Sequence, residues 1–276
     1  MGYDVYGIDN KAFGTSENYA DKNFYEQYID CFNNTSKEFL STFHTVIHCA
    51  THNILYAQDH PLDVIENNTL KTIDFFSRFD GKIINISTSS VYGDTETIPT
   101  KESDKINCTE AYSMSKRIVE MYLKKRGNYT TIRPSNFYGI NQRPENPYAG
   151  VLGKFIHCAL NDKPMTIYGT GEQTRSYTYV SDIVDSITSA VWQLPINDEV
   201  NVGSPEEISA IDLCKLVWKC TDKVVRYERV PERAIDKIKR RALDISKAKE
   251  LLGWQPQISL EEGLKKTINW QKTLSK

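Results

Sequence analysis

Two stretches decide the fold: KIINISTSSVYG (Lys82–Gly93) and EAYSMSK (Glu110–Lys116). The first is a β-branched run that ends in small hydroxyl residues, which is typical of a buried strand that ends at a functional site. The second opens a predicted helix, on which Tyr112 and Lys116 stand four residues apart and share one face. We therefore predict one site that joins the strand end, with Thr88, to this helix face.

The residue types at this site suit proton transfer from an alcohol. A cation beside a phenol favours the phenolate and lowers the pKa, so Tyr112 next to Lys116 could accept a proton near neutral pH. Thr88 could hydrogen-bond the same alcohol oxygen. Tyrosine and lysine at this spacing also occur on solvated helix faces. The hydroxyl-rich strand end and the Val91-Tyr92-Gly93 that follows it are what favour catalysis.

The composition is that of an ordinary globular protein, with 39% hydrophobic and 25% charged residues. A net charge of −2 gives no electrostatic reason to expect nucleic acid or an anionic membrane as a partner. We see no membrane-spanning run and no signal peptide, and the six cysteines are scattered, which favours a cytoplasmic location. His44, His48 and His52 lie on a strand and its exit, so we expect no metal site.

Short apolar runs alternate with helical segments through the first two thirds of the chain. This order predicts an α/β fold with a doubly wound parallel sheet, which binds ligands at the carboxyl ends of its strands. Strands are expected at 4–10, 24–29, 45–50, 83–86 and 129–132, and an amphipathic helix at 61–78. We predict two interleaved domains, one of residues 1–147 and 178–204 and a smaller one of residues 148–177 and 205–276.

The chain resembles the extended short-chain dehydrogenase/reductase family, and within it the nucleotide-sugar epimerases and dehydratases such as UDP-glucose 4-epimerases. The resemblance implies a Rossmann-like domain, a smaller C-terminal substrate-binding α/β domain, and a homodimer that pairs helices 61–78 and 112–126 in a four-helix bundle. Beyond Tyr112 and Lys116 it rests on VIHCA (46–50), NN (67–68), RPSNFYG (133–139), IYGTG (167–171), TRSY (174–177), DISKA (244–248) and LGW (252–254).

The resemblance also implies NAD as the cofactor. Asp9, at a strand end, would bind the adenosine ribose and disfavour NADP, although a capping or solvated aspartate is the alternative. Asp30 would hold the adenine edge, and Lys116 would bond the nicotinamide ribose. The other residues predicted to contact NAD are Asn10, Cys31, Cys49, Ala50, Thr51, Asn67 and Tyr112.

The implied substrate is a nucleotide-diphosphate sugar, with a UDP-sugar favoured. Asn136 and Arg175 would contact its diphosphate. The basic run at 237–241 is either a solvated loop or a second phosphate clamp, and Arg233, Arg240 and Arg241 are rivals for that role. The other predicted substrate contacts are Thr88, Ser89, Lys154 and, within the basic run, Arg241.

The reaction is predicted from the residues that follow Thr88. Relatives that dehydrate or decarboxylate carry an acidic residue before the Val-Tyr-Gly, where this chain has Ser89 and Ser90. Serine does not perform acid–base chemistry without an activating neighbour, which favours C4 epimerisation by oxidation, rotation of the keto sugar and reduction. A 4,6-dehydratase, a decarboxylase or a reductase is the alternative.

The chain departs from the family before Asp9, where the family has a strand, a glycine-rich turn and a helix. The printed sequence lacks the strand and the turn, so we expect two strand edges and apolar surface to be exposed. A fragment or a misplaced start is the favoured explanation, because the other motifs are intact. The alternatives are an impaired remnant that binds sugar nucleotide or a partner without turnover, and a missing unit supplied by another chain.

Overall fold

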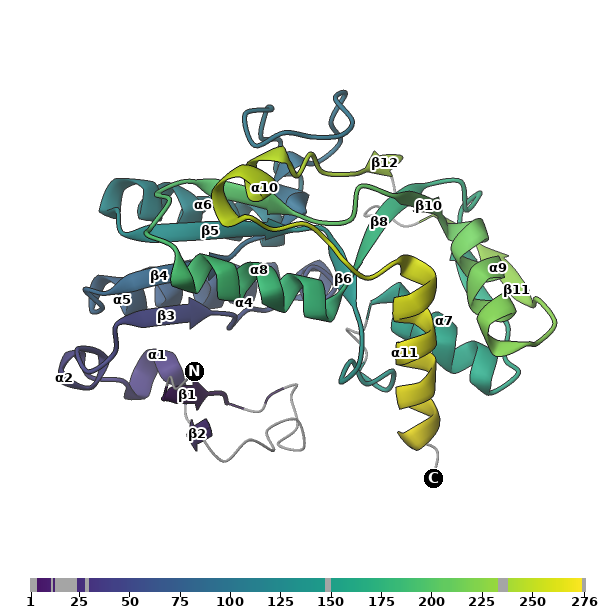
Figure 1. Cartoon of the computed structure of the whole chain (residues 1–276), viewed down its shortest axis with the longest axis horizontal. Helices are drawn as coiled ribbons and strands as arrows, with labels where there is room; N and C mark the ends of the chain where they lie inside the picture. Colours follow the sequence, from purple (N-terminus) through teal and green to yellow (C-terminus); the bar gives the residue numbers. More distant parts are fainter. Residues whose placement is uncertain are drawn as a thin grey trace.

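The computed structural model describes residues 4–10, 12, 24–27, 30–146, 150–232 and 238–274. Its larger part is a parallel sheet with helices on both faces, and its smaller part packs beside the carboxyl ends of the strands (Figure 1). The α/β class and the parallel sheet predicted from the sequence are confirmed. The division into two domains stays a prediction.

The central sheet has the strand order β3-β4-β5-β9, and each neighbouring pair is parallel. Both faces of β4 are covered, which explains its continuous β-branched run. The amide of Ser87 donates to the carbonyl of Ile132 (2.8 Å), so β4 and β5 end at the same edge. The strands are β3 (Thr45–His48), β4 (Lys82–Ile86), β5 (Tyr129–Pro134) and β9 (Glu199–Val202).

Two helix layers bury opposite faces of this sheet. On one face, α5 and α6 pack phenylalanines and leucines against Ile83 and Tyr129. On the other, α8 and α10 pack against Ile84, Ile132 and Val200. The four helices are α5 (Thr72–Ser77), α6 (Ala111–Arg126), α8 (Val180–Trp192) and α10 (Ser246–Leu252).

The amphipathic helix predicted at 61–78 is present and contains a π-helical turn. It runs through α4 (Pro61–Ile65), the π-helical turn Glu66–Lys71 and α5 without interruption. Within this segment Thr72 Oγ1 donates to the carbonyl of Asn67 (3.1 Å), five residues earlier. Such turns are frequent at functional sites.

The smaller part is built around a second core. Trp218 is fully buried there, among residues from three helices and β7. The helices are α7 (Val151–Leu160), α9 (Ala210–Thr221) and α11 (Leu260–Leu274). Its strands are β7 (Met165–Tyr168), which pairs with β11 (Tyr227–Val230), and β8 (Thr174–Tyr179), which pairs with β6 (Asn136–Tyr138), β10 (Glu207–Ser209) and β12 (Arg240–Arg241).

Strands β1 (Val5–Ile8) and β2 (Phe24–Gln27) form a separate parallel pair. Within the described residues β1 and β3 do not pair, and Val5 and Ile47 are 49% and 46% exposed. Three short helices complete this region: α1 (Cys31–Asn34), α2 (Lys37–Leu40) and α3 (Tyr56–Asp59). None of the described helices has the length and apolar character needed to cross a membrane.

Candidate active site

The end of β4 and the start of α6 form the centre of the site. Beyond Ile86 the chain enters a 3₁₀ turn, Ser89–Tyr92, which is capped by Thr88: its Oγ1 accepts from the amide of Ser90 (3.1 Å). The start of α6 is capped by Glu110, whose carboxylate accepts from the amides of Tyr112 (2.6 Å) and Ser113 (2.9 Å). These caps fix the backbone on which Thr88 and Tyr112 stand.

Thr88 and Tyr112 meet as predicted, but the pKa of Tyr112 does not move as predicted. Burial raises the pKa of Tyr112 to about 12; the hydrogen bond from Thr88 lowers it and the charge of Glu110 raises it. Lys116 Nζ lies 6.0 Å from the centroid of the Tyr112 ring. The prediction of a lowered tyrosine pKa is therefore wrong, because the cost of burying a phenolate exceeds the help of a cation at that distance.

Lys116 is a buried cation held by a backbone carbonyl. Its side chain donates to the carbonyl of Ile86 (2.9 Å), and the residue is 3% exposed. Burial lowers the pKa of Lys116 to about 8, and the charges of Cys49 and Glu120 partly oppose this shift. The Lys116 ammonium therefore loses its proton at a lower pH than an ordinary lysine does.

The residues after β3 line the same region. Cys49 is exposed at the end of β3, near Lys116, and Ala50 and Thr51 are half-buried. Asn68, on the π-helical turn, binds His52, the residue that follows Thr51. Its side-chain amide makes two 2.8 Å hydrogen bonds with the backbone of His52.

The acidic residues predicted to bind the adenosine half of the cofactor also lie together. Asp9 follows β1, and Asp30 caps α1 by accepting from the amide of Phe32 (2.9 Å). Burial raises the pKa of the Cys31 thiol to about 11, and the charges of Asp30 and Asp9 add to the shift. Asp9 and Asp30 thus both lie near the Cys31 thiol, and their contacts with NAD stay a prediction. Asn10 is exposed and accepts from the amide of Ala12 (3.0 Å).

Two arginines approach the site from the smaller part. Arg175 on β8 and Arg241 on β12 are partners in the strand register. Arg241 Nη1 donates to Ser90 Oγ (3.2 Å), and its buried Nε has no hydrogen-bond partner within the described residues. Burial lowers the pKa of Arg241 to about 10, and repulsion by Arg175 contributes. The two cations are held side by side in spite of that repulsion.

The structure separates two of the rival arginines. Arg240, next to Arg241, is exposed and forms an ion pair with Glu207, so it is engaged away from Ser90. Arg233 lies outside the described residues. Asn136 begins β6 and is the register partner of Tyr177, two residues beyond Arg175.

The other predicted contacts are less central. Lys154 is exposed on α7, and Asn67 is half-buried and donates to Asn68 Oδ1 (3.1 Å). The sequence interpretation gave no role to Glu110, and it named Asn68 only as part of the Asn67-Asn68 motif. An acidic residue directly before a helix is a recognisable cap, whereas the grip of Asn68 on a distant loop has no local signal.

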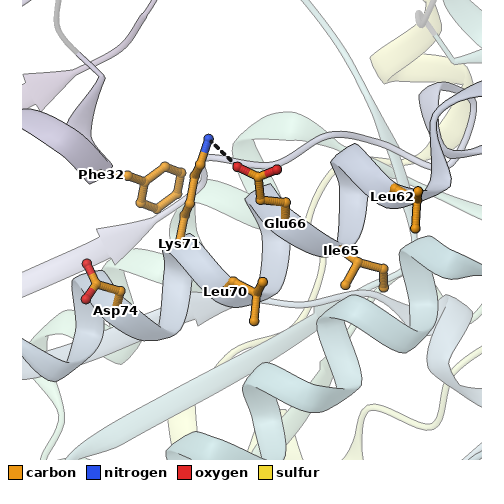
Figure 2. A pocket seen from close by; sticks show the side chains of 7 residues that line it. All are labelled: Phe32, Leu62, Ile65, Glu66, Leu70, Lys71 and Asp74. Carbon is orange, nitrogen blue, oxygen red and sulfur yellow. Dashed lines mark ion pairs between the residues drawn. The ribbon is translucent and has the colours of Figure 1, made fainter.

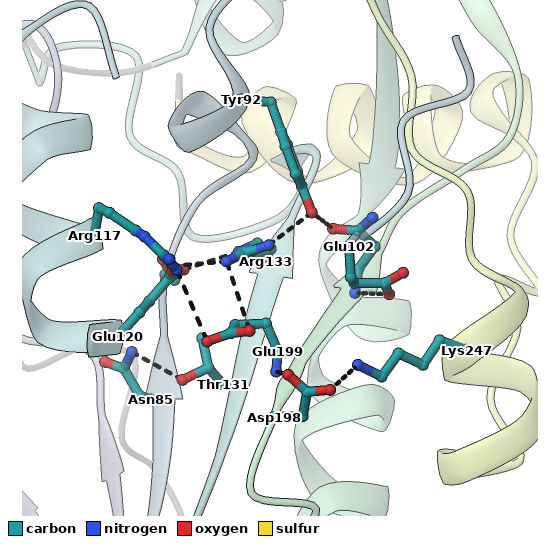
Figure 3. A network of polar contacts seen from close by, with 12 residues as sticks. Asn85, Tyr92, Glu102, Arg117, Glu120, Thr131, Arg133, Asp198, Glu199 and Lys247 are labelled. Carbon is teal, nitrogen blue, oxygen red and sulfur yellow. Dashed lines mark hydrogen bonds and ion pairs between the residues drawn. The ribbon is translucent and has the colours of Figure 1, made fainter. Parts of the chain in front are cut away.

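A buried polar network lies beneath the site (Figure 3). Glu120, one helical turn after Lys116, accepts from Arg133 Nε (2.9 Å) and Nη2 (2.7 Å). It also accepts from the hydroxyl of Ser87 (2.6 Å), the neighbour of Thr88. The network thus ties α6, β5 and the end of β4 to one carboxylate.

Comparisons with known proteins identify the family of this chain. Residues 1–203 match the family model described as NAD dependent epimerase/dehydratase family. A UDP-glucuronic acid decarboxylase 1 from Danio rerio is 34% identical over 76% of this chain and 53% of its own length, so the chain spans about half the length of such decarboxylases. A putative UDP-glucose 4-epimerase from Methanocaldococcus jannaschii is 31% identical over 98% of this chain and 91% of its own length.

Solved structures are also similar along nearly the whole chain. UDP-glucose 4-epimerase from Thermotoga maritima has a TM-score of 0.92 at 28% identity, with 100% of this chain and 93% of that chain covered. UDP-glucuronic acid 4-epimerase from Bacillus cereus, solved with UDP-glucuronic acid and NAD, has a TM-score of 0.87 at 26% identity, with 99% and 92% covered. The chain thus belongs to the NAD-dependent epimerase/dehydratase family, a family of enzymes that use NAD.

Proposed function

We propose that this chain catalyses the 4-epimerisation of a UDP-sugar. The observation that carries the proposal is the hydrogen-bonded Thr88–Tyr112 pair beside Lys116, with two arginines facing the same strand end. The relatives named as UDP-sugar 4-epimerases support the substrate class. NAD, which Asp9, Asp30 and Lys116 would hold, would supply the hydride acceptor for oxidation at C4 of the sugar and the hydride donor for the reduction that follows.

Tyr112 is the group that exchanges a proton with the C4 oxygen. It accepts the proton as the alcohol becomes a ketone and returns it when the ketone is reduced. Thr88 hydrogen-bonds the phenol and orients the sugar hydroxyl. Since burial raises the tyrosine pKa, the phenolate depends on nearby positive charge, which Lys116 supplies.

The residues around the 3₁₀ turn favour epimerisation over dehydration or decarboxylation. Ser89 and Ser90 occupy the positions at which an added acid would act, and Ser90 is engaged with Arg241. The neighbouring carboxylate, Glu110, accepts hydrogen bonds from two amides of α6. The decarboxylase relatives make decarboxylation of a UDP-uronic acid the second candidate.

The arginines supply the binding energy for the nucleotide. Arg175 and Arg241 would contact the diphosphate, whose negative charges relieve the repulsion between them, and Asn136 would donate to the same group.

The test is turnover of UDP-glucose, UDP-glucuronic acid and UDP-N-acetylglucosamine with added NAD, followed by NMR of the sugar. We expect a 4-epimer, and we expect Tyr112→Phe to lower the rate by about 10³-fold, the scale of a lost acid–base group. Tyr122→Phe, on the same helix but in the α5–α6 core, is the matched control and should retain activity. Full activity of Tyr112→Phe would refute the mechanism.

The products separate the rival functions. A pentose nucleotide with carbon dioxide would identify a decarboxylase, and a released 4-keto-6-deoxy sugar a dehydratase. Binding of UDP without turnover would identify an impaired chain.

We further propose a homodimer formed by α4–α5 and α6, in which a second copy covers their outer faces. Leu62 and Leu70 are 81% and 62% exposed, and they line a hollow of about 620 Å³ with Ile65 and Phe32 (Figure 2). Met121 on the neighbouring helix α6 is also exposed. Apolar helix faces of this kind suit a four-helix bundle. Sedimentation should give twice the chain mass, and Met121→Asp should give the monomer.

A further inference from the structure

A line of buried hydrogen bonds joins the network beneath the site to the segment that carries Arg241. Arg133 Nη1 donates to the hydroxyl of Tyr92 (2.9 Å), which donates to Asn201 Oδ1 on β9 (2.7 Å). Asn201 Nδ2 donates in turn to the carbonyl of Thr100 (3.0 Å). These residues are at most 1% exposed. The line therefore crosses from β5 to β9 and on to the loop that follows the 3₁₀ turn.

Thr100 continues the line into the segment around Arg241. Its amide donates to the carbonyl of Ala242 (2.9 Å), and its carbonyl accepts from the amide of Asp244 (2.8 Å). Thr100 is thereby paired with Leu243 as a single parallel bridge. The guanidinium of Arg241 contacts Ser90, its backbone pairs with β8, and Thr100 holds the residues that follow it, Ala242 and Asp244.

Asn201 is the residue that fixes Thr100. It holds the loop with its side chain, and its amide also donates to Glu102 Oε1 (2.7 Å). Truncation of Asn201 would leave the Tyr92 hydroxyl and the Thr100 carbonyl buried with one partner fewer. Asn85 on β4 is equally buried, but its side chain makes one long hydrogen bond, to Thr131 (3.3 Å).

We infer that Asn201 is a positioning residue for the diphosphate, which acts by holding Thr100 and hence Arg241 in place. Asn201 itself does not contact the ligand. The inference rests on the proposed function, because it assumes that Arg241 binds the diphosphate of a UDP-sugar.

The test compares two ligands that differ in the diphosphate. Dissociation constants for UDP and for uridine are measured by titration calorimetry on the wild type, Asn201→Ala and Asn85→Ala. We expect Asn201→Ala to weaken the binding of UDP about tenfold, the scale of one charge-assisted hydrogen bond. The dissociation constant for uridine should stay unchanged within about twofold. Asn85→Ala, the matched control, should keep the wild-type ratio of the two constants, whatever its stability.

A milder variant covers the case in which Asn201→Ala does not fold. Tyr92→Phe keeps the ring and removes one hydroxyl from the line, and we expect it to weaken UDP about threefold relative to uridine. A wild-type ratio in a folded Asn201→Ala or, failing that, in Tyr92→Phe would overturn the inference while the proposed function stands. Equal affinity of the wild type for UDP and uridine would instead overturn the diphosphate assignment, and this inference with it.

Discussion

Two arginines in this molecule, Arg133 and Arg241, differ in whether a carboxylate is paired with them. Beneath the site, Arg133 is buried and paired bidentately with Glu120, and Arg117 shares the same carboxylate. At the site, Arg241 makes no ion pair within the described residues and has Arg175 as its strand neighbour. Arg133 is thus neutralised by a hydrogen-bonded carboxylate, whereas the side chain of Arg241 is hydrogen-bonded, within the described residues, to a neutral hydroxyl.

The difference shows how a buried cation can be assigned to structure or to function. A buried arginine without a paired carboxylate costs free energy. Burial and repulsion by Arg175 lower the pKa of Arg241 to about 10, although the charges of Glu110 and Asp94 oppose the shift. The Glu120 pair instead raises the pKa of Arg133. We therefore assign Arg133 to stability and propose that Arg241 binds the ligand.

The largest expected effect is on the paired group. Arg133→Met leaves Glu120 buried without its main partner, so we expect a loss of about 3–5 kcal/mol in the free energy of unfolding, measured in urea. Arg117→Gln, whose side chain is 30% exposed, is the control and should cost less than about 1 kcal/mol. A loss below about 1 kcal/mol for Arg133→Met would erase the distinction between the two groups.

Lys116 offers an intermediate case, a buried cation whose described hydrogen bond goes to a carbonyl. Its pKa is about 8 in the folded state, against 10.5 for an ordinary lysine, so the folded state binds fewer protons than the unfolded state between these pH values. Stability should therefore rise with pH from about 8 to 10.5, by up to about 3 kcal/mol, and the gain should be absent below pH 8. The measurement is the unfolding free energy of the wild type minus that of Lys116→Met across this range. A flat difference would show that the ammonium is not buried as described.

The smallest effect is expected at Arg241. Arg241→Gln should weaken the binding of UDP about tenfold. The free energy of unfolding should be unchanged or slightly higher, because the substitution removes the repulsion by Arg175. Arg240→Gln is the neighbouring control: it breaks the exposed pair with Glu207 and should not change UDP affinity. If Arg240→Gln weakened UDP as much as Arg241→Gln, the assignment from strand register would be wrong.

Much of the fold was accessible from local patterns. The β-branched runs at 45–50 and 83–86 predicted buried parallel strands, and the 3.6-residue periodicity at 61–78 predicted a helix; the structure has both. The π-helical turn inside that helix was not predicted; Asn68, which lies on it, bonds the backbone of His52, sixteen residues earlier in the chain. Hydrophobic periodicity predicts which face of a helix is buried, but it does not predict the contacts of its side chains with distant segments.

The site divides in the same way. Thr88, Tyr112 and Lys116 could be named from the sequence, because their spacing along one strand end and one helix turn fixes their relative positions. The choice between Arg240 and Arg241 could not, because alternate residues of β12 point to opposite sides and only the register with β8 says which side faces Ser90.

By itself, then, the sequence determined the α/β class, the family and the chemical groups at the strand end. The tertiary structure decided the pKa of Tyr112, the pairing of Arg133 and the contact of Arg241 with Ser90. The physical reason is that spacing along one element is a local property, whereas burial and charge balance are set by segments that lie far apart in the chain.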